Sequence, residues 1–489
     1  MSFQHQTEAF TGWLSSNDVH LSSKVQITDL RSKNMGRGIV ATEDIEADEE
    51  LFTIPRSIII NVENCGLIRD YPDLSKKFVD LNHWESLIII LMYEIKAKGS
   101  SSFWAPYFNI LPINDEENYT FNQLVFWNDE ELSHLKPSLI LERIGKDMSE
   151  VMFSKLYPII VEEMELSMLK NITIDDYNKV ASIIMSYSFD VDNGADEEDE
   201  EDEEDENEDE SSKSNKGNFK SMVPLADTLN ADTNLNNSKL IYKDSSLVMR
   251  SIKKISKGEQ IFNTYSDHPN SEILRRYGYV EKDGSKYDFG EVPLSVIKTY
   301  FMKQSNLSES DLDDIFLFLT EILSEENEDD EVIEIILDSY DCFSTNEVIL
   351  ELIFLIQVLT ILISIHRISS INLMTKNAKF QLVNRIFKKC YQLIESKRLT
   401  KVFLTNFEKI LNTRLAEYPN IETPEGNDRR FLADVVVKSE YQSLKNCLDL
   451  EKTFSEYKFV DDEKLLKNII KKRFSEDNSS EEDVKRTKR

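Results

Sequence analysis

The chain has 489 residues, with 57 Lys and Arg against 90 Asp and Glu, which gives a formal net charge of −33 at pH 7. Domains typically hold roughly 100–200 residues, so this length predicts about two to four of them. The 40% hydrophobic and 10% aromatic content predicts that most of the chain folds around real cores. So acidic a chain repels phosphate backbones, which argues against general nucleic-acid binding, and it attracts basic proteins.

The four cysteines are far apart and form no CxxC pair, which argues against a disulfide framework and a structural zinc site: Cys65, Cys342, Cys390 and Cys447. The N-terminal residues Met1–Phe10 lack the basic and apolar regions of a secretory signal. The most apolar segment, Val348–Ile365, contains Glu351, Gln357 and Thr360, so we interpret it as a buried core helix rather than a membrane span. We therefore expect a soluble intracellular protein with no metal site.

The first 62 residues predict mainly short strands. Residues 8–18 have the spacing of a short helix, and four strand-like segments follow it: Val25–Leu30, Gly38–Thr42, Glu50–Pro55 and Ser57–Val62. Gly36, Arg37 and Gly38 would form the turn between the first two strands.

Helical periodicity then dominates as far as residue 189, over the segments 82–98, 129–146, 150–170 and 176–189. Beyond it, fourteen of the fifteen residues from Asp196 to Glu210 are carboxylates. Residues 190–217 have no apolar core positions after Val191, so we expect a disordered acidic loop. This loop could steer a basic partner, or it could be a solvated run with no partner.

Folding resumes at Phe219–Pro224, and three short strands are predicted after it: Leu240–Tyr242, Leu247–Ser251 and Gln260–Tyr265. Residues 293–470 have an almost wholly helical period, with turn signals near 325–330 and 419–427. This layout predicts an α+β fold rather than alternating βαβ units. We expect a mainly-β domain at 20–290, split by a helical insertion at about 65–189 and by the acidic loop, an all-α domain at 291–474, and a polar basic tail at 475–489.

Conventional catalytic motifs are missing from the sequence. The six histidines form no HxxxH or HExxH spacing, and there is no P-loop and no GxSxG elbow. What remains is a set of polar and aromatic residues beside short strands: Gly36-Arg37-Gly38, Asp227 with Asn230, and Tyr265 with Tyr277. Each has a structural alternative, namely a plain hairpin turn, a capping or turn pair, and core aromatics with solvated hydroxyls.

Four motifs occur in an order and spacing that resemble a SET-domain lysine methyltransferase: GRGIVATEDIEADEELFTIP, FWAPYFNILP, MVPLADTLN and GEQIFNTYSDHPNSEILRRYGYVE. More narrowly, residues 20–470 resemble the Rubisco large-subunit methyltransferase group. In that group a helical insertion divides the SET domain, and a helical substrate-binding domain follows. The fungal enzymes that methylate a lysine of a large-subunit ribosomal protein look closest.

The resemblance implies S-adenosylmethionine as the methyl donor, and it assigns residues by position. Tyr277 of RYGY matches the tyrosine beside the reacting amine. The cofactor-binding positions are Met35, Gly36, Arg37, Tyr187, Asn230, Ala231 and Tyr287. The lysine channel would be completed by Phe189, Asp227, Tyr242 and Tyr265, and Tyr287 could serve there instead. One departure is Ala231, where the family usually has a histidine after the asparagine.

Methyl transfer to an amine is an in-line displacement that needs alignment and an amine that has lost its proton. A sulfonium beside an aromatic, poorly solvated channel lowers the pKa of the substrate lysine by like-charge repulsion and desolvation. We therefore expect an orienting and electrostatic role for Tyr277, with a general-base role as the second choice, because a phenol is a weak base at neutral pH.

The sequence thus predicts a monomeric protein-lysine methyltransferase acting on a basic ribosomal protein, without direct nucleic-acid or membrane binding. The alternatives are a methyltransferase of histone or another nuclear protein, and a SET-fold adaptor without activity, which Ala231 alone favours. The basic clusters Lys471-Lys472-Arg473 and Lys485-Arg486 resemble a bipartite nuclear import signal, so we expect a nuclear location, with the cytoplasm as the alternative. The sequence encodes neither the target lysine nor the number of methyl groups added.

Overall fold

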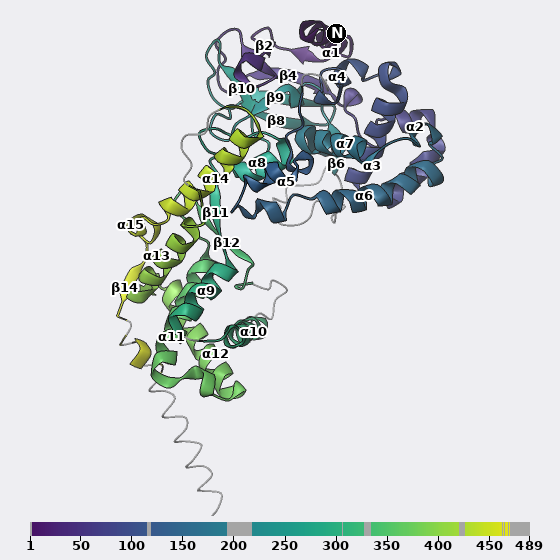
Figure 1. Ribbon diagram of the computed structural model, residues 1–489. Helices are drawn as coiled ribbons and strands as arrows, with labels where there is room; N and C mark the ends of the chain where they lie inside the picture. Colours follow the sequence, from purple (N-terminus) through teal and green to yellow (C-terminus); the bar gives the residue numbers. More distant parts are fainter. Residues whose placement is uncertain are drawn as a thin grey trace, which may run out of the picture. The chain divides into compact units, whose positions relative to one another are not determined.

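The computed structural model describes residues 2–114, 119–192, 218–305, 307–326, 334–419, 426–461, 463, 465–467 and 469. The chain forms two compact units (Figure 1). The first consists of Met1–His134, Ile140–Lys286 and Glu425–Leu432, and the second of Leu135–Leu139, Tyr287–Pro424 and Ala433–Arg489. The domain limits expected from the sequence remain a prediction, and the tail 475–489 lies outside the described residues.

The first unit is built on two four-stranded sheets, which confirms the α+β class. One sheet has the order β1-β4-β9-β8, from His20–Leu21, Glu50–Pro55, Ser246–Ser251 and Ser238–Lys243. The other has the order β2-β3-β10-β7, from Val25–Asp29, Arg37–Ala41, Gln260–Asn263 and Asn230–Ala231. Six of the predicted strand segments are therefore confirmed. Strand β2 has the alternation of a half-buried strand, with Val25 and Ile27 buried and Gln26 exposed.

One predicted strand, Ser57–Val62, is wrong. The chain instead forms a short 3-10 helix at Arg56–Ile58, and only Ile60 makes a single β-bridge, to Met222. The Asn64 side-chain amide donates to the carbonyl oxygens of Ser57, at 2.6 Å, and Ile59, at 2.8 Å. These carbonyls are then satisfied without a strand partner. The three isoleucines of this segment are buried, and an apolar run by itself does not distinguish a strand from other buried backbone.

The helical insertion packs on the first unit's core through α3 (His83–Met92), α6 (Lys146–Pro158) and α7 (Ile174–Tyr187), which lie together in Figure 1. Helices α3 and α7 begin at capping boxes, Asn82 with Glu85 and Thr173 with Asp176, in which each side chain satisfies a free backbone N–H. The N-terminal helix α1 spans Phe3–Ser16, and the short helices α2 (Gly66–Asp70), α4 (Ala105–Phe108) and α5 (Asp129–Ser133) complete this region with α8 (Asn270–Tyr277).

The predicted helix at 129–146 is shorter than expected, because α5 ends at Ser133. Pro137 lacks a backbone N–H and disfavours helical backbone at the residue before it, so the helix does not continue. The expected acidic loop also starts later. Residues Asp190–Asp192 lie in β5 (Ser188–Asp192), which pairs with β6 (Asn218–Met222), and Lys220 forms a cross-strand ion pair with Asp190 at 3.3 Å. Residues 193–217 lie outside the described part of the chain.

The second unit is mainly helical, with α9 (Leu294–Ser305), α10 (Glu309–Glu326), α11 (Leu350–Ser369), α12 (Lys376–Glu395), α13 (Lys401–Leu415), most of α14 (Arg429–Asn446) and α15 (Leu450–Thr453). The prediction of an almost wholly helical segment misses two small sheets: β11 (Phe289–Pro293) with β12 (Ser339–Phe343), and β13 (Arg398–Thr400) with β14 (Lys458–Val460). These strands have three to five residues and distant partners, so no local period announces them.

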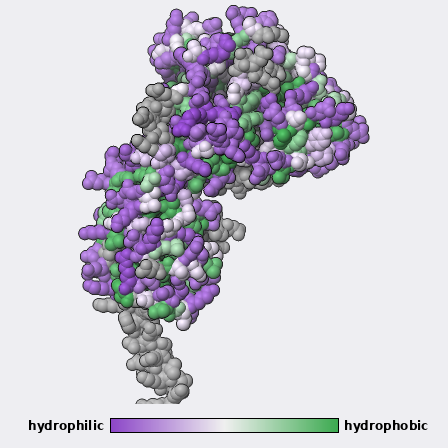
Figure 2. Space-filling model, in the orientation of Figure 1, coloured by the Kyte–Doolittle hydropathy of each residue, from purple (hydrophilic) through white to green (hydrophobic). Residues whose placement is uncertain are grey.

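Helix α11 is the apolar segment that the sequence analysis singles out. Its length and composition would suffice to cross a membrane, but 72% of the window Leu350–Ile368 is buried inside the structure. Such burial is what a core helix of this unit requires, and α11 contributes more residues than its neighbours to the second hydrophobic core. Figure 2 shows hydrophilic residues over much of the visible surface, with hydrophobic residues between them.

A buried polar cluster in the second unit centres on Glu440 of α14. Its carboxylate accepts hydrogen bonds from the Ser138 hydroxyl, at 2.5 Å, and from the Tyr418 hydroxyl, at 2.9 Å. Arg414 donates to the carbonyl oxygens of Glu291 and Pro137, both at 2.9 Å. The segment Leu135–Leu139 is thereby fixed to the second unit. Burial raises the pKa of Glu440 to about 7, against the opposing effect of its two hydroxyl donors.

We predict that Glu440→Gln removes a pH dependence of stability. Because the folded pKa lies above the unfolded one, the wild-type stabilisation is complete below about pH 4.5 and is lost as pH rises through 7. At pH 8 the free energy of unfolding of the variant should exceed that of wild type by up to about 3 kcal/mol, as measured by urea denaturation. The exposed Glu451→Gln is the matched control, and equal pH profiles for Glu440→Gln and wild type would contradict the assignment.

Candidate functional site

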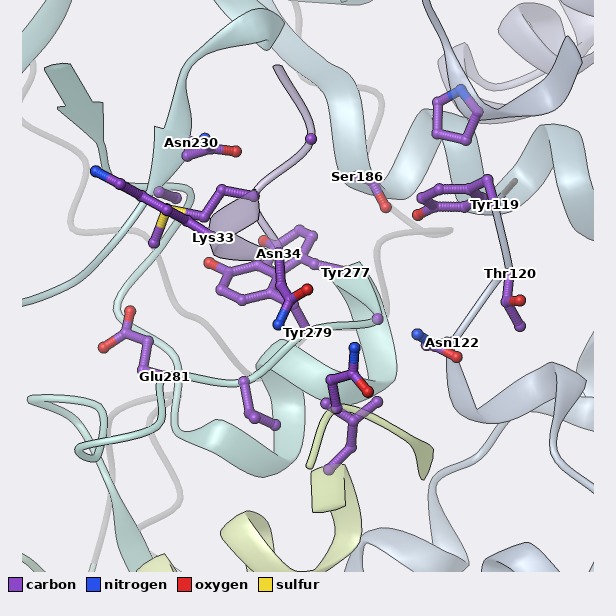
Figure 3. A pocket seen from close by; sticks show the side chains of 18 of the residues that line it. Lys33, Asn34, Tyr119, Thr120, Asn122, Ser186, Asn230, Tyr277, Tyr279 and Glu281 are labelled. Carbon is purple, nitrogen blue, oxygen red and sulfur yellow. The ribbon is translucent and has the colours of Figure 1, made fainter. Parts of the chain in front are cut away.

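A cavity of about 1750 Å³ opens in the first unit, and every described residue that lines it belongs to that unit. Pockets for a single drug-sized ligand are roughly 300–1,000 Å³, so this one has room for two ligands or for one ligand and a peptide segment. Its walls come from α1, the loop before β3, the segment 119–122, the end of α7, the segment 227–235, the chain after β10 and the segment 426–432 (Figure 3).

One wall is the loop Leu30–Gly36, which enters β3. It is closed by hydrogen bonds from the Leu30 N–H to the Gly36 carbonyl, at 2.7 Å, and from the Met35 N–H to the Leu30 carbonyl, at 3.2 Å. Gly36 has φ +58°, a backbone conformation that residues other than glycine rarely adopt. The local sequence therefore holds Met35 and Gly36 at the cavity edge, with Met35 38% exposed.

The second sheet brings Asn230 to this loop. Strand β7 pairs in parallel with β10, with Phe262 opposite Asn230, and β10 pairs with β3 on its other side. The Asn230 side-chain amide donates to the Arg37 carbonyl at 3.2 Å. A Cβ atom at Gly38 would lie 2.9 Å from that amide nitrogen and 2.6 Å from the Leu30 Cδ1 atom, so only glycine permits this close approach.

A cluster of three tyrosine rings forms the centre of the site. Tyr265 and Tyr277 meet edge to face with ring centroids 5.1 Å apart. The Tyr279 ring centroid lies 6.3 Å from that of Tyr277, and Figure 3 shows these two side chains close together. Tyr277 is the last residue of α8, and Gly278, with φ +75°, ends the helix in the left-handed conformation. This cap turns the chain so that the tyrosines on both sides of the glycine line the same cavity.

Two further tyrosines face this cluster from the helical insertion. Tyr187 is the last residue of α7, and its side chain is hydrogen-bonded to Tyr119. Figure 3 shows Tyr119 on the same side of the cavity as Ser186. Burial raises the pKa of Tyr187, Tyr119, Tyr265 and Tyr279 above the usual phenol value. The Tyr265 hydroxyl also donates to the Leu229 carbonyl at 2.9 Å. These phenols are therefore neutral at physiological pH.

Asp227 is a buried acidic residue that lines the cavity, and it is 5% exposed. Burial raises its pKa to about 7, although the Tyr107 hydroxyl donates a hydrogen bond to one carboxyl oxygen. The other carboxyl oxygen, Oδ1, and the neighbouring Thr228 hydroxyl are buried without a hydrogen-bond partner among the described residues. Buried polar atoms without partners are costly, so these atoms suit a polar ligand group.

The rim is fixed by two other networks. Glu281 accepts from the backbone N–H of Thr233 at 2.7 Å, and its own backbone N–H and carbonyl are held by the Asn270 side chain. Arg429, at the start of α14, donates to the Phe121 carbonyl at 2.9 Å and forms an ion pair with Glu131 at 2.7 Å. The segment 426–432 is thus held as part of the cavity wall.

The cavity brings together nine of the twelve residues that the sequence analysis proposes: Met35, Gly36, Arg37, Tyr187, Asp227, Asn230, Ala231, Tyr265 and Tyr277. The other three do not line it. Phe189 lies in β5 opposite Ser221 and packs on the core, Tyr242 is 38% exposed on β8, and Tyr287 belongs to the second unit. The sequence analysis missed Tyr279, Tyr119, Glu281 and Phe3. Only Tyr279 had a signal, as the second tyrosine of RYGY.

These residues fit the cofactor that the sequence resemblance implies. The wall of Met35, Gly36 and Arg37 offers backbone groups and an apolar side chain, and the close approach at Gly38 sets the Asn230 amide beside it. Ala231 adds a small side chain at the same wall. Among the described residues, no group of three or more His, Cys, Asp or Glu side chains is arranged to hold a metal ion.

Several known proteins are similar to this chain in sequence. A family model described as SET domain matches residues 36–266. Ribosomal lysine N-methyltransferase 4 of Saccharomyces cerevisiae is 41% identical over 498 residues, covering 98% of this chain and 98% of that protein. N-lysine methyltransferase setd6 of Xenopus laevis is 31% identical over 277 residues, 56% of each chain.

Two solved structures have the same fold over almost the whole chain. The structure of Rubisco LSMT bound to sinefungin and monomethyllysine has a TM-score of 0.62 at 19% identity, and covers 93% of this chain and 94% of that one. The structure of Rubisco LSMT bound to AdoMet has a TM-score of 0.61 at 18% identity, with the same coverage. The architecture expected from the sequence resemblance is confirmed.

We predict that Asp227→Asn stabilises the protein at alkaline pH. The folded pKa of Asp227 is raised, so its wild-type contribution is complete below about pH 3.8 and is lost as pH rises through 7. At pH 8 the variant should be more stable by up to about 4 kcal/mol. In the wild type, ionisation of Asp227 should increase the affinity for a lysine-containing substrate between pH 6 and 8. The Asp227→Asn variant should not show this increase.

Asp283→Asn, an exposed acid at the rim of the same cavity, is the matched control and should change neither property. Urea denaturation and the Michaelis constant for a lysine substrate, both followed from pH 6 to 8.5, measure the two effects. Identical pH profiles for wild type and Asp227→Asn would show that this carboxyl does not titrate near neutrality.

Proposed function

The chain belongs to the SET-domain protein-lysine methyltransferases, and we propose that it transfers methyl groups from S-adenosylmethionine to a lysine of a large-subunit ribosomal protein. The observation that carries this proposal is the 41% identity with Ribosomal lysine N-methyltransferase 4 of Saccharomyces cerevisiae, which extends over 98% of both chains. The similar region therefore spans the cavity walls as well as the matched SET region. The relative's name gives a ribosomal substrate, and the large subunit is our narrower proposal.

The cavity divides the work between two groups of residues. Met35, Gly36, Arg37, Asn230 and Ala231 would hold S-adenosylmethionine, which supplies an electrophilic methyl group on a sulfonium when it is bound. The tyrosine cluster of Tyr265, Tyr277 and Tyr279 would hold the alkyl stem of the lysine between its rings and orient the amine through the hydroxyls.

The amine must be uncharged to attack, although a free lysine has a pKa of about 10.4. Neutral aromatic walls disfavour its charged form, because they exclude water from the amine. The Tyr277 hydroxyl then orients the nitrogen lone pair toward the methyl carbon, a positioning effect rather than proton abstraction. Asp227 acts earlier in this scheme, because its ionised form attracts the ammonium group to the cavity.

The charge of the chain supports a basic protein as the partner. With a net charge of −33, it attracts the cationic proteins of the ribosome by long-range steering. We propose that the helical second unit docks this substrate, that the enzyme acts as a monomer, and that it works in the nucleus, before ribosome assembly. The basic clusters that motivate the nuclear location lie outside the described residues. A histone substrate is the competing proposal, since the same fold accepts many proteins.

We predict that Tyr277→Phe lowers kcat by roughly 10²-fold, as expected when one preorganised hydrogen-bond donor is lost from a transition state. The dissociation constant for S-adenosylmethionine should stay within about threefold of wild type, because the ring remains. The assay is transfer of labelled methyl groups to ribosomal proteins from cells that lack this protein, with histones as competing acceptors.

Tyr242→Phe is the matched control, because that tyrosine lies on β8 and does not line the cavity. A single labelled ribosomal band that the Tyr277 variant loses and the Tyr242 variant retains supports the proposal. Label on histones alone would move the substrate to the nuclear alternative. No transfer and no cofactor binding by wild type would instead indicate the adaptor.

A further inference from the structure

The N-terminal helix α1 (Phe3–Ser16) has two faces with different surroundings. Phe10 and Leu14 are buried in the first unit's core, and Phe3, Gln6 and Thr7 lie on the same side of the helix. The opposite side is exposed and carries Gln4, His5 and Glu8. The spacing is that of an amphipathic helix packed on a domain. Two residues of the inner face, Phe3 and Gln6, also line the cavity.

The Arg37 side chain ties this helix to the wall proposed to hold the cofactor. Its Nε donates to the Thr7 hydroxyl at 3.0 Å, and its Nη2 donates to the Phe3 carbonyl and to the Gln6 Oε1, both at 3.2 Å. Its Nη1 donates to the Ile110 carbonyl at 3.0 Å. A guanidinium with donors committed in three directions is fixed in place, and so is the backbone that carries it.

Phe3 is held by two guanidinium groups. The Arg37 Cζ lies 3.7 Å and the Arg31 Cζ lies 4.1 Å from the centre of its ring. Both distances are within the range of cation–π contacts. Arg31 lies near the start of the loop Leu30–Gly36, and Arg37 directly follows it. The Phe3 ring therefore contacts arginines at both ends of this loop.

The backbone of Arg37 is therefore held from two sides: α1 fixes its side chain, and Asn230 donates to its carbonyl oxygen. Helix α1 also reaches the other wall of the cavity. Phe10 contacts the ring of Tyr107, with centroids 6.2 Å apart, and Tyr107 donates to Asp227. All of α1 lies before residue 36, where the match to the SET model begins.

We propose that α1 is a cofactor-binding element of this enzyme, in which Phe3 and Gln6 complete the cavity wall and position the Met35–Arg37 backbone through Arg37. This inference rests on the proposed function, because it takes S-adenosylmethionine as the ligand of that wall. A preorganised wall lowers the cost of binding, since the loop need not be ordered when the ligand arrives. Phe3 and Gln6 are positioning and wall residues, and transfer itself stays with the tyrosine cluster.

The test compares two glutamines on opposite sides of one helix. Gln6→Ala and Phe3→Ala should each raise the dissociation constant for S-adenosylmethionine about fivefold to tenfold, by calorimetry on the full chain. Gln4→Ala, on the exposed side, should leave it unchanged. The KM for the protein substrate should stay within about twofold in every variant. A purely structural role would instead lower the unfolding temperature without cofactor and leave the affinity of the folded fraction unchanged.

Thr7→Val keeps the shape of the inner face and removes one acceptor of Arg37, so it should weaken cofactor binding in the same direction even if Phe3→Ala folds poorly. Unchanged cofactor affinity in Gln6→Ala, Phe3→Ala and Thr7→Val would overturn the inference. A rise in protein KM alone would also overturn it, because the wall would then face the protein substrate. If wild type itself binds no S-adenosylmethionine, the proposed function is wrong. If wild type and all three variants bind it equally well, only the inference about α1 is wrong.

Discussion

The site depends on the pairing of β7 with β10, the only parallel contact described in the first unit's two main sheets. Strand β7 has two residues, yet its position beside β10 sets Asn230 opposite Phe262 and within reach of the Arg37 carbonyl. Segments separated by almost two hundred residues thus form one wall. Gly38 makes the approach feasible, because any larger residue would meet the Asn230 amide. A substitution at Gly38 or Asn230 would therefore disturb both β3 and β7, the strands that form this wall of the cavity.

The charges of the cavity follow from its burial. Four tyrosines have raised pKa values, so they present neutral hydroxyls at physiological pH, and burial raises the pKa of Asp227 to about 7. A cavity of this kind would not take the lysine proton with a phenolate. It would favour an uncharged amine by excluding water, and the Asp227 carboxyl would modulate how strongly an ammonium group is attracted. The same raised pKa makes the fold less stable as pH rises, a cost that a cationic ligand offsets.

Most residues that the sequence analysis proposes for the site line one cavity, although their roles stay a prediction. Asn230 and Tyr277 lie in two of the quoted motifs, and pairing of β7 with β10 brings these motifs together in the fold. The predictions for Phe189, Tyr242 and Tyr287 used spacing along the chain, which does not say on which side of a strand or in which unit a side chain lies. Tyr279 was missed because its orientation depends on the left-handed cap at Gly278, a property of the folded helix end.

Two cavity-lining groups outside the matched SET region suggest how one fold obtains different specificities. Phe3 and Gln6 of α1 precede that region and residues 426–432 follow it by more than a hundred residues, yet both groups line the cavity. Each is held by an arginine with several hydrogen bonds, Arg37 for α1 and Arg429 for the later segment. Part of this anchoring does not depend on the neighbouring side chains, because some of the hydrogen bonds are accepted by backbone carbonyls, those of Phe3, Ile110 and Phe121. Substrate and cofactor preferences could then change through α1 and 426–432 without altering the strands that align the reacting groups.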